Sequence, residues 1–132
     1  MSMDRISNMV SSLKNCSMAG KDILEIPYTK ECEDIAKVLK SREYIEEVKT
    51  FKNEGSTFKM LSIKLAKDGD HMRLTEAKRV SKPGRRVYRG YQELKPVLGG
   101  IGVLVVSTSR GIMDSLEAKK KKLGGEVICK VY

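Results

Sequence analysis

Apolar residues recur at helical spacing in two stretches near the start of the chain. The first stretch carries Ile6, Met9, Val10 and Leu13, and the second carries Cys32, Ile35, Val38 and Leu39. The i, i+3, i+4, i+7 spacing of the first predicts an amphipathic helix that begins at Asp4 and ends near Asn15. Thr29 precedes the second stretch and is expected to cap another helix, with Glu31 and Glu33 in its first turn.

The hydrophobic period changes from helical spacing to two in the strands of the first half. DILEIPY, residues 22–28, predicts a short strand that is limited by Pro27. YIEEVKTFK and FKMLSIKLAK flank the turn NEGS, so they predict a β-hairpin whose second strand buries Leu61, Ile63 and Leu65. The order expected for the first half is therefore helix, strand, helix, strand, strand.

The turn sequence KDGDH, residues 67–71, divides the chain into an N-terminal half, residues 1–68, and a C-terminal half, residues 69–132. Halves of this size form only marginal cores alone, so we expect them to share a packed interface. The second half predicts strands at MRLTEAKRVS, RRVYRG, IGVLVVS and EVICKVY, with Val127, Cys129 and Val131 on one side of the last strand. Residues 91–98 allow a helical turn or two, and Asp114 begins a helix that continues through the lysine run to Gly124. The fold class is α+β, with two small mixed subdomains packed together.

Positive charge is concentrated in the second half of the 132 residues. The net charge is +9, yet residues 1–70 carry twelve Lys/Arg and twelve Asp/Glu, whereas residues 71–132 carry fourteen Lys/Arg and five Asp/Glu. A positive electrostatic field concentrated on one half of the chain favours the binding of a polyanion to that half. The alternative is that the charge only keeps a small protein soluble.

Several functional classes find no support in the sequence. Cys16, Cys32 and Cys129, with the single His71, lack the spacing of a zinc site and suit reduced thiols in the cytosol. No secretory signal and no apolar run of ~20 residues is present, so a soluble intracellular protein is expected. We expect no metal and no cofactor.

Catalytic and nucleotide-binding motifs are also missing. VVSTSRG, residues 105–111, does not match the Gly-x-Ser-x-Gly nucleophile elbow, and His71 has no evident catalytic partner. Gly99, Gly100 and Gly102 precede an apolar strand, whereas phosphate-binding glycines follow one, so they indicate close packing at the strand entry.

Two segments of the basic half carry the chemistry of RNA recognition. RVSKPGRRVYRGY, residues 79–91, interleaves cations that neutralise phosphates with Tyr88 and Tyr91, whose rings can stack on bases. Its alternative is a charged edge strand. The hydroxyls of Ser107, Thr108 and Ser109 can contact base edges, ribose and phosphate, or can instead satisfy their own turn. Both segments lie in the basic half, which favours RNA binding.

RVSKPGRRVY, GGIGVLVVSTSRGIM and GGEVICKVY, in this order, resemble ribosomal protein eight of the small subunit, of bacterial or organellar type. The resemblance covers essentially the whole chain. It implies a two-part α+β protein, monomeric outside the ribosome, whose C-terminal part binds the central domain of small-subunit ribosomal RNA early in assembly. Departures include Lys14 in place of a usual arginine, Glu43 in place of a usual glycine, and a lysine-rich run at 119–122.

The resemblance also implies a set of RNA-binding residues. Ser107, Thr108 and Ser109 would meet an irregular RNA helix, with Tyr88, Gly124, Gly125 and Glu126 beside them, Lys82, Arg86 and Arg110 near phosphates, and Asp4, Lys14 and Asn15 reaching RNA or neighbouring ribosomal proteins. We therefore expect a non-enzymatic ribosomal protein, in the cytoplasm or in an organelle with bacterial-type ribosomes. The alternatives are a general RNA binder, a messenger RNA repressor, a small nucleotide-dependent enzyme, or a basic adaptor for membranes or acidic proteins.

Overall fold

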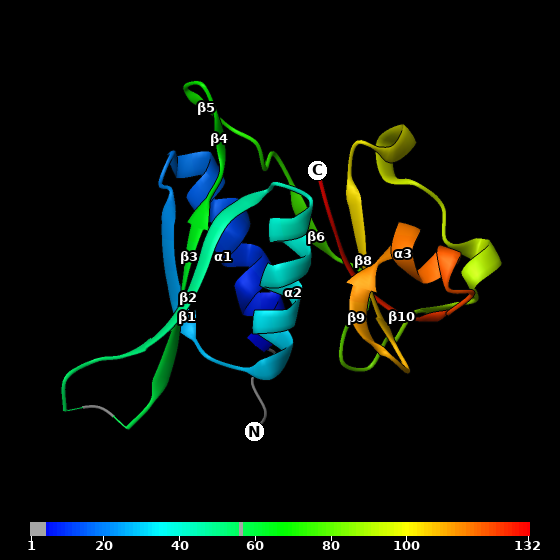
Figure 1. Ribbon diagram of the computed structural model, residues 1–132, viewed down its shortest axis with the longest axis horizontal. Helices are drawn as coiled ribbons and strands as arrows, with labels where there is room; N and C mark the ends of the chain where they lie inside the picture. The colour runs from blue at the N-terminus through cyan, green and yellow to red at the C-terminus, as the bar shows by residue number, and fades with distance from the viewer. Residues whose placement is uncertain (1–4, 56) are drawn as a thin grey trace.

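The first half of the chain packs two helices against a three-stranded antiparallel sheet. The computed structural model describes residues 5–55 and 57–132. The elements are α1 (Arg5–Ala19), β1 (Ile23–Pro27), α2 (Lys30–Ser41), β2 (Ile45–Lys52) and β3 (Lys59–Leu65). The sheet order is β1-β3-β2, and both helices lie on the side that faces the rest of the protein (Figure 1). The predicted order of elements is confirmed, and Leu61, Ile63 and Leu65 are buried as expected.

The helix ends follow local capping rules, with one difference from the prediction. The Thr29 hydroxyl accepts a hydrogen bond from the Cys32 backbone N–H at 3.1 Å, which confirms the predicted cap of α2. Asp4, the expected cap of α1, lies outside the described residues. α1 continues one turn beyond Asn15 to Ala19, because the residue that ends it is Gly20, which adopts a left-handed φ of 72°.

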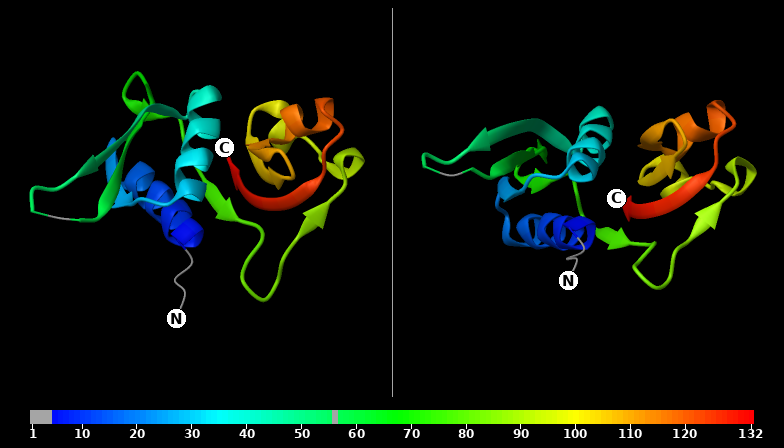
Figure 2. Two further views of the ribbon diagram at one scale, coloured as in Figure 1. Left: turned by 60° about the horizontal axis from the view of Figure 1, so that its bottom comes forward. Right: turned by 90° about the horizontal axis from the view of Figure 1, so that it is seen from below.

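The second half is built mainly from strands. Its elements are β4 (Lys67–Asp68), β5 (His71–Met72), β6 (Ala77–Arg79), β7 (Tyr88–Arg89), the 3₁₀ turns η1 (Tyr91–Glu93) and η2 (Val97–Gly100), β8 (Val103–Thr108), β9 (Gly111–Asp114), α3 (Ser115–Lys120) and β10 (Gly125–Val131). The sheet order is β6-β10-β8-β9, and β7 also pairs with β10. In Figure 2, β10 runs as a curved strand through the centre of this half. The α+β fold class is confirmed.

β9 was not predicted as a strand, nor was the short pairing of β4 with β5 at the predicted turn KDGDH, and α3 is shorter than expected. β9 forms a hairpin with β8, in which Thr108 lies opposite Gly111 and only two residues make the turn. The stretch GIMD has just two apolar residues before the cap of the next helix, so its period was too short to detect. α3 ends at Lys120, before the two glycines that were expected to end it.

A β-bulge in β10 changes which residues share a face of the sheet. Val127 lies opposite Val106, whereas Cys129 lies opposite Val105, so Ile128 is the extra residue. Opposed residues point to the same face, and neighbouring residues of one strand point to opposite faces. Val127 therefore lies on the opposite face to Cys129, and the prediction of a common side with Val131 was wrong for Val127.

The two halves share one hydrophobic core. The main cluster of buried side chains includes Met9, Leu13 and Ile35 from the first half, and Val105 and Val131 from the second. A smaller cluster lies between α3 and the other face of the large sheet. The shared core holds the halves side by side (Figures 1 and 2). The boundary at residue 68 remains a prediction.

Candidate nucleic-acid interface

Three polar side chains from three neighbouring strands form a row at one end of the large sheet. Glu126 in β10 lies opposite Tyr88 of β7 on one side and opposite Ser107 of β8 on the other. Residues directly opposite one another project from the same face, so we call Tyr88, Glu126 and Ser107 the polar row. Ser107 lies two residues beyond the buried Val105, so the polar row continues the face that forms the shared core. The Tyr88 side chain is 64% exposed, which leaves its ring accessible.

The Glu126 carboxylate is held within the protein. The Ser81 hydroxyl donates to its Oε2 at 2.5 Å, and Nη1 of Arg86 donates to the same oxygen at 3.0 Å. Ser81 is fully buried, and its Oγ also accepts from the Val87 backbone N–H at 3.1 Å. This network connects residues 81–87 to β10 and partly neutralises the carboxylate. The position of Ser81 was not predicted, because a single serine in a basic segment gives no sequence signal of burial.

The hydroxyl turn, residues 107–110, divides its hydroxyls between two roles. The Thr108 hydroxyl donates to the Gly111 carbonyl at 2.8 Å and accepts from the Arg110 backbone N–H at 3.1 Å, so it closes the β8–β9 turn. Within residues 5–55 and 57–132, no hydrogen bond of the Ser107 or Ser109 hydroxyl is found, and Ser109 is exposed. The alternative of self-satisfied hydroxyls therefore holds for Thr108, while Ser107 and Ser109 remain available to a ligand.

Gly124 and Gly125 allow β10 to pass closely between its neighbours. A Cβ at Gly124 would lie 2.6 Å from the Arg89 carbonyl oxygen, and one at Gly125 would overlap the Ser107 carbonyl. Both positions therefore require glycine for close backbone approach. The two glycines thus bring β7 and the hydroxyl turn together beside the polar row.

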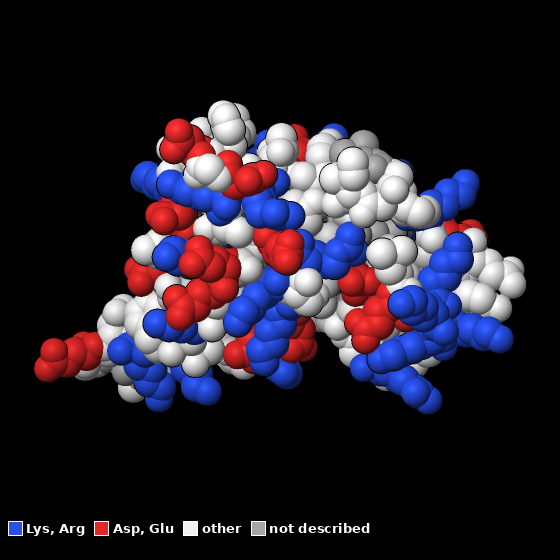
Figure 3. Space-filling model, turned by 45° about the horizontal axis from the view of Figure 1, so that its top comes forward, with Lys and Arg blue, Asp and Glu red and all other residues white. Residues whose placement is uncertain are grey.

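Exposed cations border the polar row along the segment between β6 and β7. Lys82 and Arg85 pair across a tight turn that contains Gly84, and both side chains are exposed, as is Arg86. Arg79 has a structural role instead, because it donates to the Ser7 hydroxyl of α1 and to the Ile128 carbonyl. Figure 3 shows Lys and Arg gathering over the C-terminal half, whereas both charge signs alternate over the N-terminal half.

The chain is similar to known proteins over its whole length. The family model described as Ribosomal protein S8 matches residues 4–132. The chain is 38% identical to "Small ribosomal subunit protein uS8c" of Welwitschia mirabilis, over 98% of this chain and 100% of the relative. It is 37% identical to "Small ribosomal subunit protein uS8" of Nautilia profundicola, over 98% of both chains. The chloroplast-type relative of Chaetosphaeridium globosum is 33% identical over the full length of both.

The chain belongs to the ribosomal protein S8 family. The resemblance stated from the sequence is thereby confirmed, and so is the expectation of a non-enzymatic protein, since the family is one of structural ribosomal proteins. The relatives come from bacterial and chloroplast lineages, which agrees with the bacterial or organellar type expected. None of the helices in residues 5–55 and 57–132 has the length and hydrophobicity needed to span a membrane.

The predicted residues of α1 lie away from the polar row in this S8-family chain. Lys14 forms an ion pair with Glu76 at 3.1 Å, and its hydrogen bond is the main cause of the lowered pKa of the Glu76 carboxyl. The Glu76 backbone pairs with the Tyr132 backbone, just beyond the last residue of β10. Tyr132 is six residues from Glu126, which is roughly 20 Å along an extended strand. Asn15 is exposed on the same helix. The structure therefore gives two separate groups of predicted residues, at opposite ends of β10.

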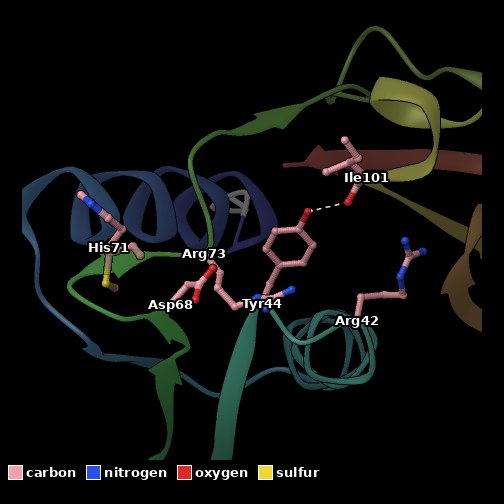
Figure 4. A pocket seen from close by; sticks show the side chains of 7 residues that line it. Arg42, Tyr44, Asp68, His71, Arg73 and Ile101 are labelled. Carbon is pink, nitrogen blue, oxygen red and sulfur yellow. Dashed lines mark hydrogen bonds between the residues drawn. The ribbon is translucent and has the colours of Figure 1, made fainter.

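A cavity lies at the junction of the halves and not at the polar row. Its volume is about 480 Å³, and its lining residues are Arg42, Tyr44, Asp68, His71, Met72, Arg73 and Ile101. The Tyr44 hydroxyl donates to the Ile101 carbonyl at 2.8 Å (Figure 4), and Arg42 donates to the carbonyls of Gly100 and Gly102. These bonds fasten α2 and β2 to the segment that precedes β8.

The glycine and cysteine predictions have structural explanations. A Cβ at Gly102 would lie 2.5 Å from Cγ1 of Val97, so this glycine serves the close packing that was predicted for the strand entry. Cys32 and Cys129 are buried thiols outside any disulfide, and burial raises the pKa of Cys129 to about 12. A thiol with such a pKa is not a nucleophile at neutral pH. No cluster of metal-ligating side chains is found among the residues that the structure describes.

Proposed function

We propose that this protein is a component of the small ribosomal subunit, and that its C-terminal half binds the central domain of small-subunit ribosomal RNA and supports its assembly. The names of the relatives support the first part of the proposal. The concentration of net charge in residues 71–132 supports the second. On this proposal, the protein is located in a ribosome, either in a bacterial cytoplasm or in an organelle, with ribosomal proteins as neighbours.

The observation that carries the proposal is the polar row beside the hydroxyl turn. Three side chains lie together at this end of the sheet. They are the exposed ring of Tyr88, the hydroxyl of Ser107, which makes no hydrogen bond within the described residues, and the exposed Ser109. Regular A-form RNA hides its base edges in a deep, narrow major groove, whereas irregular helices expose bases for stacking and hydrogen bonding. A rigid group of hydroxyls and a ring is therefore suited to an irregular RNA helix.

The residues of this surface have different roles in the proposal. Ser107, Ser109 and Tyr88 contact bases and ribose, while Lys82, Arg86 and Arg110 contact phosphates. Glu126 acts through its bonds to Ser81 and Arg86, which fix the loop that carries the cations. Gly124, Gly125 and Thr108 shape the backbone of the surface, and only their main-chain groups reach RNA.

The group on α1 forms a second, separate contact region. Lys14 and Asn15, with Asp4, reach RNA or a neighbouring ribosomal protein in this proposal. The charge of Lys14 is then partly neutralised by Glu76, because Nζ of Lys14 lies 3.1 Å from Oε1 of Glu76. Its contribution to affinity is accordingly smaller than that of the exposed cations of the second half.

Binding to a central-domain ribosomal RNA fragment, measured across a salt series beside a regular RNA duplex of equal length, tests the proposal. We expect a preference for the fragment that persists as salt rises, because hydrogen bonds and stacking are less salt-dependent than phosphate contacts. Affinities that are equal and fall together would mean that only a basic surface is present, and the proposal would be wrong.

Replacement of Ser109 with alanine is expected to weaken binding to the fragment by about 1.5 kcal/mol, or roughly tenfold, with no change in stability. The hydroxyl is exposed and has no role in the turn, so only a bound RNA loses a partner. Thr108→Ala is the matched comparison, because it removes the two hydrogen bonds of the turn and should lower the melting temperature as well. Unchanged affinity of Ser109→Ala would remove this hydroxyl from the interface.

A further inference from the structure

The lysine turn, residues 119–122, ends α3 with a fixed backbone. The Leu123 N–H donates to the Ala118 carbonyl at 2.8 Å, and the Lys122 N–H donates to the Lys119 carbonyl at 3.1 Å. This pair of bonds is a Schellman motif, in which the residue at the position of Lys122 is left-handed and is most often glycine. Lys122 has a φ of 56°, so a lysine holds a conformation that favours glycine.

The charges of the lysine turn are directed to solvent. All four lysines are exposed, and in residues 5–55 and 57–132 the one ion pair found among them joins Lys121 to Glu117 at 3.0 Å. Favourable interaction of cations with the helix C-terminus explains Lys119 and Lys120. It does not explain Lys122, because glycine there would relieve the backbone and the helix would keep its other lysines.

The lysine turn adjoins the strand that carries Tyr88. Gly124 packs directly on the Arg89 carbonyl and the Gly90 Cα, and α3 also contacts η1. Arg89 is exposed, so its charge adds to that of the turn. The nearby acidic groups are Glu93, which accepts from the Gly90 N–H, and Glu117, which is paired. The lysine turn and Arg89 therefore form one positively charged surface next to the strand that carries Tyr88 of the polar row.

We propose that the lysine turn, with Arg89, is a second docking surface for RNA, which binds the backbone phosphates of a regular duplex without reading their sequence. The inference rests on the proposed function in taking RNA as the polyanion. Lysine is a flexible point charge that needs no bidentate geometry, which suits phosphates in varying positions. The lysine turn and Arg89 themselves offer only cationic side chains, so they attract phosphates but do not discriminate between bases.

A membrane surface is the less favoured occupant. Leu116 is the exposed large apolar residue of α3, at 44%, and the helix has six residues. Helices that lie in a membrane interface bury a broad apolar face, which a six-residue helix with one exposed leucine does not offer. Phosphates of RNA require only the cations.

Lys122→Gly in the full chain, with a regular RNA duplex as the probe, tests the inference. We expect the melting temperature to rise by about 3 °C because the left-handed strain is relieved. We also expect duplex affinity near physiological salt to fall about fivefold, and the slope of log K against log salt to shrink by about 1. A variant that binds duplex as tightly and with the same slope as the parent would overturn the inference.

Two control variants separate charge from backbone strain. Glu43 occupies the same position at the end of α2, with a φ of 68°, so Glu43→Gly should raise the melting temperature without weakening duplex binding. Lys52→Ala removes one exposed cation from the β2–β3 hairpin of the other half and should leave the slope unchanged. An equal loss in Lys52→Ala and Lys122→Gly would mean that net charge alone acts, and would overturn the inference.

Two further measurements distinguish failure of this inference from failure of the proposed function, and RNA from a membrane as the ligand. Lys122→Gly should keep the preference for the ribosomal fragment over the duplex, since that preference belongs to the polar row. Absence of this preference in the unmodified protein would count against the proposed function, whether or not Lys122→Gly weakens duplex binding. Lys122-dependent binding to phosphatidylserine vesicles, with duplex binding unchanged, would overturn the inference in favour of a lipid surface.

Discussion

Replacement of Gly125 with alanine is expected to lower the free energy of unfolding by about 3 kcal/mol and to abolish RNA binding. Gly125 lies between two strands, opposite Arg89 of β7 and Thr108 of β8. An added Cβ would overlap the Ser107 carbonyl, which is backbone and cannot rotate away, so β8 and β10 must separate. The separation moves the hydroxyl turn, with Ser107, away from Tyr88 and Glu126. Urea unfolding and fragment binding measure the two effects.

Gly90→Ala is the matched control for this substitution. Gly90 has an ordinary φ of −71°, and an added Cβ there would lie 3.5 Å from Oε1 of Glu93, which is an ordinary contact. It should therefore change the free energy of unfolding by less than about 1 kcal/mol. Equal stabilities of the two variants would show that β10 tolerates a side chain at its entry, against the close approach described above.

The regular elements of the first half were predictable because one pattern extends over enough residues. α2 combines a hydroxyl cap at Thr29 with an apolar stripe, and β3 alternates between buried and more exposed positions over its seven residues. β9 was missed because it has only four residues, and its pairing with β8 depends on a turn that the sequence offered as a ligand-binding loop. The bulge at Ile128 was also undetectable, since a run of apolar residues fits either face of a sheet.

The candidate site was predictable in its residues but not in its connections. The sequence singled out Tyr88, Ser107 and Glu126, but the first two on chemistry and the last only through the family resemblance. The register of β10 places the three in one row, a long-range property that no local pattern carries. The hydrogen bond from Ser81 to Glu126 was likewise hidden, because it joins residues 45 positions apart. The division of the hydroxyls, with Thr108 used by the turn itself, required the observed geometry.

Replacement of Ile35 with alanine is expected to lower the free energy of unfolding by about 3–4 kcal/mol. We expect both halves of the protein to be destabilised equally. Ile35 is fully buried in α2, a helix that contacts β2 in its own half and β9 in the other. If the shared core makes the halves one cooperative unit, a cavity in α2 destabilises β8 as much as β3. Hydrogen exchange of the slowest amides in both strands measures this directly.

Ile23→Ala provides the control, since Ile23 is 57% exposed on β1 and its removal should cost less than about 1 kcal/mol. Equal losses of protection in β3 and β8 of Ile35→Ala would mean that the C-terminal half depends on the first half for its stability. Unchanged protection in β8, with β3 weakened, would instead make the boundary at residue 68 a true division between independent units. The first outcome is expected, because α2 and β2 are fastened to the entry of β8 by Arg42 and Tyr44. The first half would then be the support that holds the polar row, the proposed RNA-binding surface, in place.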